Sequence, residues 1–133
     1  MIDFKRRKLP LLLLVALLHL TGCSRTDKQN SSGSRARKES ARVTFIELGS
    51  ANCIPCMKMQ IVMREIEREY GDQVAVIFHD VWTDAGRPYA RQYGIRVIPT
   101  QVFLDRNGEE YFRHEGYFPK VELVQVLRQK GVK

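Results

Sequence analysis

Two cysteines separated by two residues, Cys53 and Cys56, are the side chains of this 133-residue sequence best suited to covalent chemistry. Thiols at this spacing can close a disulfide and reopen it, because residues three apart on a helix share a face. They could also form half of a zinc site, or be two incidental thiols. Zinc requires four ligands, and beyond residue 23 the sequence adds only His79 and His114 and no second cysteine pair. The spacing therefore favours a reversible dithiol.

The residues around the two cysteines predict a strand, a turn and a helix. Residues 43–48 form an apolar run typical of a buried strand, and residues 49–52 are small or polar. Residues 57–70 lack glycine and proline, and their apolar side chains recur at helical spacing. The members of this stripe are Met59, Val62, Met63, Ile66 and Tyr70.

This order of elements places Cys53 at the N-terminus of the helix. Unpaired N–H groups and the positive end of the helix dipole favour a thiolate at that position. Pro55 falls in the first helical turn, where its missing N–H costs little. Cys56 is expected one turn further in, with its sulfur within reach of the first.

The first 23 residues have the composition of an export signal. Four basic residues at 5–8 precede an apolar run at 9–18, which is too short to cross a bilayer as a mature helix. The next four residues, Leu-Thr-Gly-Cys at 20–23, resemble the lipobox of bacterial lipoproteins, whose cysteine becomes the diacylated N-terminus. We therefore predict a lipoprotein signal peptide at 1–22 and lipidation of Cys23. A plain cleaved signal and an uncleaved anchor are the alternatives.

Residues 23–42 are predicted to be the lipidated N-terminus and a flexible basic tether. From 24 to 42 the sequence holds six basic and two acidic residues, whereas 43–133 holds 12 of each. The net charge of +7 therefore belongs to the leader and the tether, where it suits anionic lipid and gives no indication of nucleic-acid binding. Ser24, in place of an acidic residue, favours the outer membrane if the host is Gram-negative.

The remaining residues, 43–133, predict one α/β domain with the order β-α-β-α-β-β-α. The elements after the first helix are a strand at 73–81, a helix at 85–93 capped by Asp84, strands at 100–104 and 109–114, and a final helix opened by Pro119. The first crossovers imply parallel strands, and the last strand pair implies an antiparallel hairpin. The expected fold is a central mixed sheet with helices on both faces.

Two motifs at a fixed separation carry a family resemblance. A Cys-x-Pro-Cys motif follows the first strand, and residues 93–100 read Tyr-Gly-Ile-Arg-Val-Ile-Pro-Thr. From residue 45 to about residue 127 the sequence resembles the thioredoxin family, whose cis-proline segment the second motif matches. The resemblance implies a cis Pro99 beside the dithiol, backbone hydrogen bonds from Ile98 to an extended substrate, and close substrate approach at Gly116. A trans turn at Pro99 and a simple chain break at Gly116 are the alternatives.

The sequence departs from the family at three positions around the dithiol. Glu47 stands where the family has a buried aspartate, so we expect a buried acid that transfers protons; an edge position facing solvent is the alternative. The lysine that often pairs with this acid is missing, since an ungapped count back from Pro99 lands on Asp80. The neighbouring His79 is a candidate contact for the acid, and a plain strand histidine is the alternative. Asn52 replaces the usual tryptophan, and Trp82 is expected to pack at the end of a strand.

These residues together predict a lipid-tethered thiol–disulfide oxidoreductase. The Cys53 thiolate would attack a substrate disulfide, Cys56 would resolve the mixed disulfide, and Glu47 would help to deprotonate Cys56. The Ile54-Pro55 dipeptide and Ile98 resemble those of reducing thioredoxins, which favours a disulfide reductase.

The expected setting is the bacterial cell envelope, on the periplasmic side of a membrane. The resemblance implies a monomer without cofactor or metal, acting on disulfide-bearing exported proteins and drawing electrons from a membrane thiol donor. The alternatives are an exported oxidase or isomerase, and a non-catalytic binding module or metallochaperone that uses the same thiols.

Overall fold

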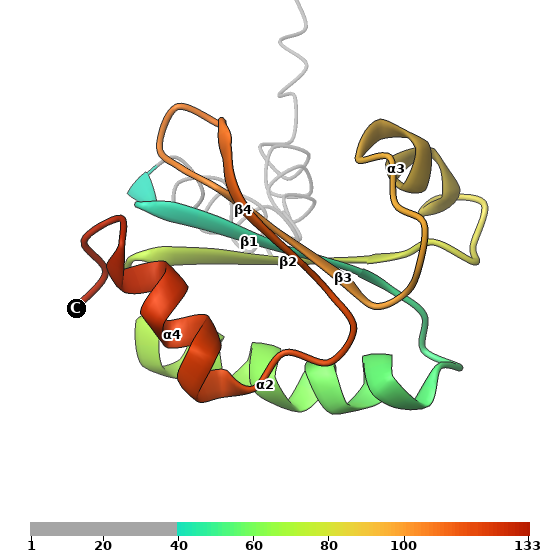
Figure 1. Cartoon of the computed structure of the whole chain (residues 1–133), viewed down its shortest axis with the longest axis horizontal. Coiled ribbons are helices and arrows are strands. Elements are labelled where there is room, and N and C mark those ends of the chain that lie inside the picture. Colours follow the sequence, from blue (N-terminus) through green and yellow to red (C-terminus); the bar gives the residue numbers. More distant parts are fainter. Residues whose placement is uncertain (1–39) are drawn as a thin grey trace, which may run out of the picture.

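The computed structural model describes residues 40–133, and the predictions for the signal peptide, Cys23 and most of the tether lie outside these residues. Four strands and three helices follow one another along the described chain (Figure 1). They are β1 (Val43–Gly49), α2 (Ile54–Tyr70), β2 (Val74–Asp80), α3 (Arg87–Gln92), β3 (Thr100–Leu104), β4 (Glu110–Glu115) and α4 (Lys120–Arg128). This is the predicted order of elements, and α2 begins directly after Cys53, as predicted.

The strands form one mixed sheet in the order β2-β1-β3-β4. β1 is parallel to β2 and antiparallel to β3, and β3 and β4 form an antiparallel hairpin. The expectation that the second crossover also joins parallel strands is wrong. The six residues of α3 span about 9 Å, whereas the seven residues of β2 span about 23 Å. A helix this short does not by itself carry the chain back along the sheet, and β3 starts at the edge of the sheet where β1 and β2 end and runs the opposite way.

The two faces of the sheet bury separate apolar clusters, as the alternation of side chains along β1 requires. Figure 1 shows α2 and α4 covering one face of the sheet. On this face Phe45 and Phe103 stack with their ring centroids 5.0 Å apart. The predicted stripe of α2 is buried there, with Tyr70 at its margin. On the other face Ile46 and Leu48 pack with residues of α3. The helices therefore cover both faces of the sheet, as predicted.

The start of α3 differs from the sequence prediction. Asp84 does not cap it; the helix begins after Gly86, and the Asp84 carboxylate pairs with Arg87 at 3.1 Å. The Gly86 N–H donates to Thr83 Oγ1 at 3.1 Å. A Cβ atom at residue 86 would overlap the carbonyl group of Asp80, so the chain can pass this close to the end of β2 only with glycine there.

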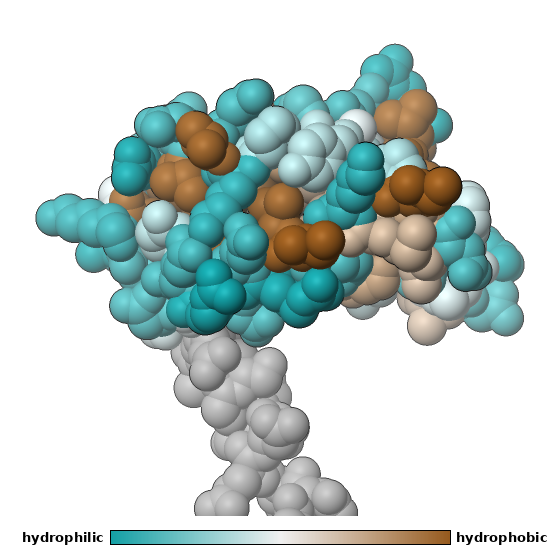
Figure 2. All heavy atoms as spheres, turned by 90° about the horizontal axis from the view of Figure 1, so that it is seen from below, coloured by the Kyte–Doolittle hydropathy of each residue, from teal (hydrophilic) through white to brown (hydrophobic). Residues whose placement is uncertain are grey.

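Apolar side chains are also present on the outer surface. Figure 2 views the face that carries α2 and α4 and shows separate apolar patches among hydrophilic residues. The large exposed apolar side chains of these two helices are Ile54, Met57, Ile61 and Val121. Among residues 40–133, no helix has both the length and the apolar character that crossing a membrane requires.

Candidate active site

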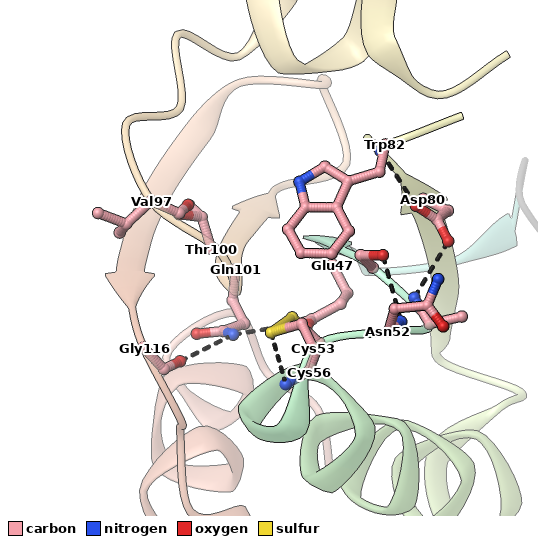
Figure 3. Close-up of a disulfide and its surroundings, with 12 residues drawn as sticks. Glu47, Asn52, Cys53, Cys56, Asp80, Trp82, Val97, Thr100, Gln101 and Gly116 are labelled. Carbon is pink, nitrogen blue, oxygen red and sulfur yellow. Dashed lines mark hydrogen bonds between the residues drawn. A yellow bond between two sulfur atoms is a disulfide. The ribbon is translucent and has the colours of Figure 1, made fainter. Parts of the chain in front are cut away.

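The dithiol lies at the edge of the sheet where β1 and β2 end and β3 begins. The turn between β1 and α2 is fastened to the end of β2 by Asp80, whose carboxylate accepts the N–H of Ala51 at 3.0 Å and that of Trp82 at 3.0 Å (Figure 3). These hydrogen bonds, first that of Ala51, hold the pKa of Asp80 below its usual value. Asp80, the residue that the ungapped count gave at the position of the missing lysine, therefore orders the turn before Cys53.

Cys53 and Cys56 are joined by a disulfide. Cys53 is the N-cap of α2, with extended backbone angles, and its sulfur accepts the N–H of Cys56 at 3.4 Å. Pro55 occupies the first turn, as expected. Cys53 is partly exposed, whereas Cys56 is completely buried. A substrate sulfur can therefore reach the first cysteine and not the second.

Glu47 lies in a central strand and is completely buried, which excludes the solvent-facing edge position. Burial raises the pKa of its carboxyl group to about 8, because a charge is poorly solvated in the interior. A hydrogen bond from Gln101 acts in the opposite direction and is the smaller effect. An acid with a pKa near neutrality can both take up and release a proton at physiological pH.

Glu47 and Cys56 meet in the space that Gly49 leaves open. A Cβ atom on Gly49 would lie 3.2 Å from the Cys56 sulfur and 3.3 Å from Glu47 Oε1. The carboxylate oxygen and the sulfur therefore border the same small volume, which suits proton exchange between them directly or through one water molecule.

The remaining candidate partner of Glu47, His79, lies on the other face of the sheet. Its ring stacks on Tyr89 with centroids 3.5 Å apart. The β2 residue paired with Glu47 is Phe78, so an aromatic ring stands where a lysine could have reached the acid. The candidate contact between His79 and Glu47 is therefore not formed, and His79 is the plain strand histidine that was its alternative.

The peptide bond between Ile98 and Pro99 is cis, as expected. The Pro99 carbonyl accepts the N–H of Gly116 at 2.8 Å, which joins the proline segment to the end of β4. Gly116 has φ +95°, a backbone conformation that residues with a Cβ atom rarely adopt. The backbone therefore requires glycine here, in addition to any role of this residue in substrate approach. The backbone role of Ile98 in holding a substrate stays a prediction.

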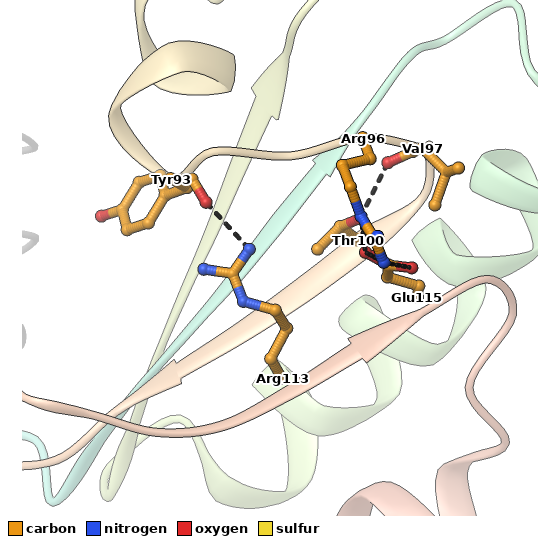
Figure 4. Close-up of polar contacts among 6 residues, drawn as sticks. All are labelled: Tyr93, Arg96, Val97, Thr100, Arg113 and Glu115. Atoms are coloured by element: carbon orange, nitrogen blue, oxygen red, sulfur yellow. Dashed lines mark hydrogen bonds and ion pairs between the residues drawn. The ribbon is translucent and has the colours of Figure 1, made fainter.

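Polar contacts hold the segment that leads to the cis-proline (Figure 4). Thr100 Oγ1 donates to the Val97 carbonyl at 2.8 Å, and Arg113 donates to the Tyr93 carbonyl at 2.8 Å. The Arg96 guanidinium binds the Glu115 carboxylate at 3.1 Å. The proline is thus tied on both sides to β4.

A family model described as a thioredoxin-like domain matches residues 3–131. The chain belongs to the thioredoxin family. Thioredoxin 1 of Synechococcus elongatus is 35% identical over 89 residues, which cover 67% of this chain and 80% of that relative. The thioredoxin of Bacillus subtilis is 28% identical over 96 residues, covering 72% of this chain and 89% of the relative. Among solved structures, a mutant thioredoxin from Halobacterium salinarum has a TM-score of 0.63 and 21% identity, covering 74% of this chain and 81% of that one.

Family membership and the disulfide between Cys53 and Cys56 identify this chain as a thiol–disulfide oxidoreductase. Thioredoxins act on disulfide-bearing proteins, and the surroundings of this dithiol suit a protein substrate. Trp82, Ile54, Val97 and Tyr117 expose 59%, 67%, 47% and 46% of their surfaces. Figure 3 shows the Trp82 indole extending from the end of β2 on the side of the disulfide. Trp82 does not pack at the end of a strand as expected, because it lies in the exposed turn that follows β2.

Gln101 is the residue of this thioredoxin site that sequence reasoning missed. It is completely buried in β3, directly opposite Glu47. The available signal was an amide inside the apolar run at 100–104, since a polar side chain in a buried strand requires a partner.

Proposed function

We propose that this protein is a disulfide reductase of the cell envelope, held to a membrane by lipid on Cys23 and acting on exported proteins. The observation that carries the direction of the reaction is the burial of Cys56 beside Glu47. Burial and a neighbouring acid both disfavour a thiolate at Cys56. A dithiol whose thiolates are poorly stabilised gives up its electrons readily, whereas a strongly oxidising enzyme stabilises its reduced form.

The surroundings of Cys53 support the same direction. Among residues 40–133, the hydrogen bond to its sulfur comes from the N–H of Cys56, and the helix N-terminus supplies the rest of the thiolate stabilisation. The two residues between the cysteines are Ile54 and Pro55, neither of which carries a proton donor on its side chain. The thiolate is therefore reactive without being held as strongly as in an oxidase.

The catalytic cycle requires three groups. The Cys53 thiolate attacks one sulfur of a client disulfide and expels the other as a thiolate, which leaves a mixed disulfide. Glu47 takes the proton of the Cys56 thiol, and the Cys56 thiolate attacks the Cys53 sulfur. The client leaves as a dithiol after protonation by solvent, and the enzyme is left with the disulfide between Cys53 and Cys56. A membrane thiol donor would return two electrons to it.

The reduction potential of the couple between Cys53 and Cys56 tests the direction. We expect a value of about −250 mV or lower, measured by equilibration with glutathione buffers and quantified by thiol alkylation. A value near −120 mV, as in a strongly oxidising exported enzyme, would replace the reductase with an oxidase.

Replacement of Cys23 tests the membrane attachment. The Leu-Thr-Gly-Cys segment at the end of the apolar run supports lipidation of this residue. In the Cys23→Ser variant, labelling with a fatty acid should be lost and the processed chain should leave the membrane fraction. Its reductase activity in solution should be unchanged. A processed variant that stayed membrane-bound would contradict the proposed anchor.

A further inference from the structure

The amide of Gln101 connects the buried acid to the substrate groove. Its Nε2 donates to Glu47 Oε2 at 3.0 Å and to the Gly116 carbonyl at 3.1 Å (Figure 3). Gln101 and Glu47 are completely buried and directly opposite in the pairing of β3 with β1. Burying an amide and an acid in a core is costly unless they bind each other, so this contact is a strong constraint on both.

The contact with Gly116 fixes which end of the amide faces the acid. A backbone carbonyl can only accept a hydrogen bond, so the nitrogen of Gln101 and not its oxygen must point toward Gly116. The same nitrogen then points toward Glu47 Oε2. Because this nitrogen can only donate, Oε2 must act as the acceptor whether the carboxyl group is charged or neutral.

The other carboxylate oxygen is the one left for a proton. Glu47 Oε1 is buried and makes no hydrogen bond within residues 40–133. It borders the space at Gly49 that the Cys56 sulfur also borders. A proton on Oε1 therefore faces the resolving thiol.

We propose that Gln101 is a positioning residue that confines proton exchange by Glu47 to Oε1, the oxygen that faces Cys56. This inference rests on the proposed role of Glu47 as the proton acceptor. In the step concerned, the Cys56 S–H proton moves to Oε1 while Oε2 keeps the Gln101 hydrogen bond. The Cys56 thiolate that remains forms the bond to the Cys53 sulfur, and the client sulfur leaves with the electron pair of the mixed disulfide.

Within residues 40–133, Gln101 is the one hydrogen-bonding partner of the Glu47 carboxyl group. Cys56 approaches from α2, and the β2 neighbour, Phe78, does not titrate. On β4 the titratable neighbour is His114, paired with Gln101 across the sheet, but its ring stacks on Phe118 with centroids 4.2 Å apart. A change in the titration of Glu47 on substitution of Gln101 would therefore report the loss of this hydrogen bond.

The test is Gln101→Met in the full-length chain in detergent, because methionine keeps the length of the side chain and removes the donor. Stopped-flow measurements with a disulfide-linked fluorescent peptide would follow attack and resolution separately from pH 5 to 10. Losing a hydrogen bond to the charged carboxylate raises its pKa. We expect the midpoint of the resolution step to rise by about one pH unit, and its rate at pH 7 to fall by roughly 3- to 10-fold, with attack unchanged.

Two controls distinguish a failure of the role proposed for Gln101 from a failure of the role proposed for Glu47. Gln73→Met removes an amide at the opposite end of the sheet, where it binds Lys133, and should leave the profile unchanged. Combining Gln101→Met with Glu47→Gln should slow resolution no more than Glu47→Gln alone. If Glu47→Gln leaves resolution unchanged, the proposed role of Glu47 is wrong. If Glu47→Gln slows resolution while Gln101→Met leaves the midpoint in place, the role of Gln101 is wrong.

A measurement on the unaltered chain covers the case in which Gln101→Met does not fold. The side-chain NH2 resonances of Gln101 should shift with pH at the same midpoint as the carboxyl carbon of Glu47, followed by NMR of the oxidised protein. Resonances of Gln101 that stay constant through the titration of Glu47 would overturn the proposal.

Discussion

Glu47→Gln should make the oxidised protein more stable at alkaline pH. Glutamine keeps most of the volume of the side chain and removes the charge that the interior solvates poorly. In the oxidised protein both cysteines are held in the disulfide and do not titrate. Changes in stability near neutral pH that depend on residue 47 can then be assigned to its carboxyl group.

The expected magnitude follows from the pKa of this group. Its pKa is about 8 in the folded protein and 4.5 as an ordinary glutamate. Between these values the folded state holds a proton that the unfolded state has released, so the free energy of unfolding falls as the pH rises through this window. From pH 5 to pH 9 the loss amounts to about 4 kcal/mol, a large share of the stability of a small domain. Glutamine at residue 47 removes this loss.

Urea unfolding of both proteins at several pH values between 5 and 9 measures the effect. The difference in the free energy of unfolding between Glu47→Gln and the unaltered chain should grow with pH in favour of the variant. Glu67→Gln, at an exposed position on α2, is the matched control and should give a constant difference. Parallel profiles for Glu47→Gln and the unaltered chain would show that Glu47 titrates normally, and would refute its assignment as a buried, proton-binding acid.

Four further substitutions test the parts of the site. Cys53→Ser should abolish turnover, whereas Cys56→Ser should accumulate mixed disulfides visible on non-reducing gels; adducts with the first variant alone would reverse the assignment. Gly49→Ala places a methyl group 3.2 Å from the Cys56 sulfur and 3.3 Å from Glu47 Oε1, so stopped-flow should show resolution slowed several-fold and attack unchanged; equal rates would show that the space at Gly49 is not used. Asp80→Ala removes two hydrogen bonds from the turn and should lower stability by about 1 kcal/mol at pH 7. Because the pKa of Asp80 is depressed, this difference should disappear in urea titrations as the pH falls through that pKa; a difference that persisted in acid would assign the effect to packing.

Local patterns were sufficient to predict most elements of this fold. The strand at 100–104 lies between a proline and a turn signal, and its predicted bounds match β3. Glu47 stands in an apolar run with no room for an exposed face, and its burial followed from that run. The position of Cys53 at a helix N-terminus likewise depended only on its neighbours in the sequence.

The features that the sequence did not reveal depend on distant parts of the chain. The direction of β3 depends on the length of α3 compared with that of β2, and the predicted helix at 85–93 was three residues too long. The contact between Gln101 and Glu47 depends on the register of β3 against β1. The pattern within one strand indicates which face each residue occupies, whereas the residue opposite it in the neighbouring strand depends on both strands.

The direction in which β1 runs also determines where the reactive end of this protein points. The chain joins the sheet at Val43 and reaches the dithiol turn at the other end of a seven-residue strand, about 23 Å away. The C-terminus is at the same pole as Val43, where Lys133 binds Gln73. The disulfide therefore lies at the pole opposite the one where the chain enters the sheet. In the anchored protein that we propose, clients and the membrane thiol donor would both have to reach this distal pole.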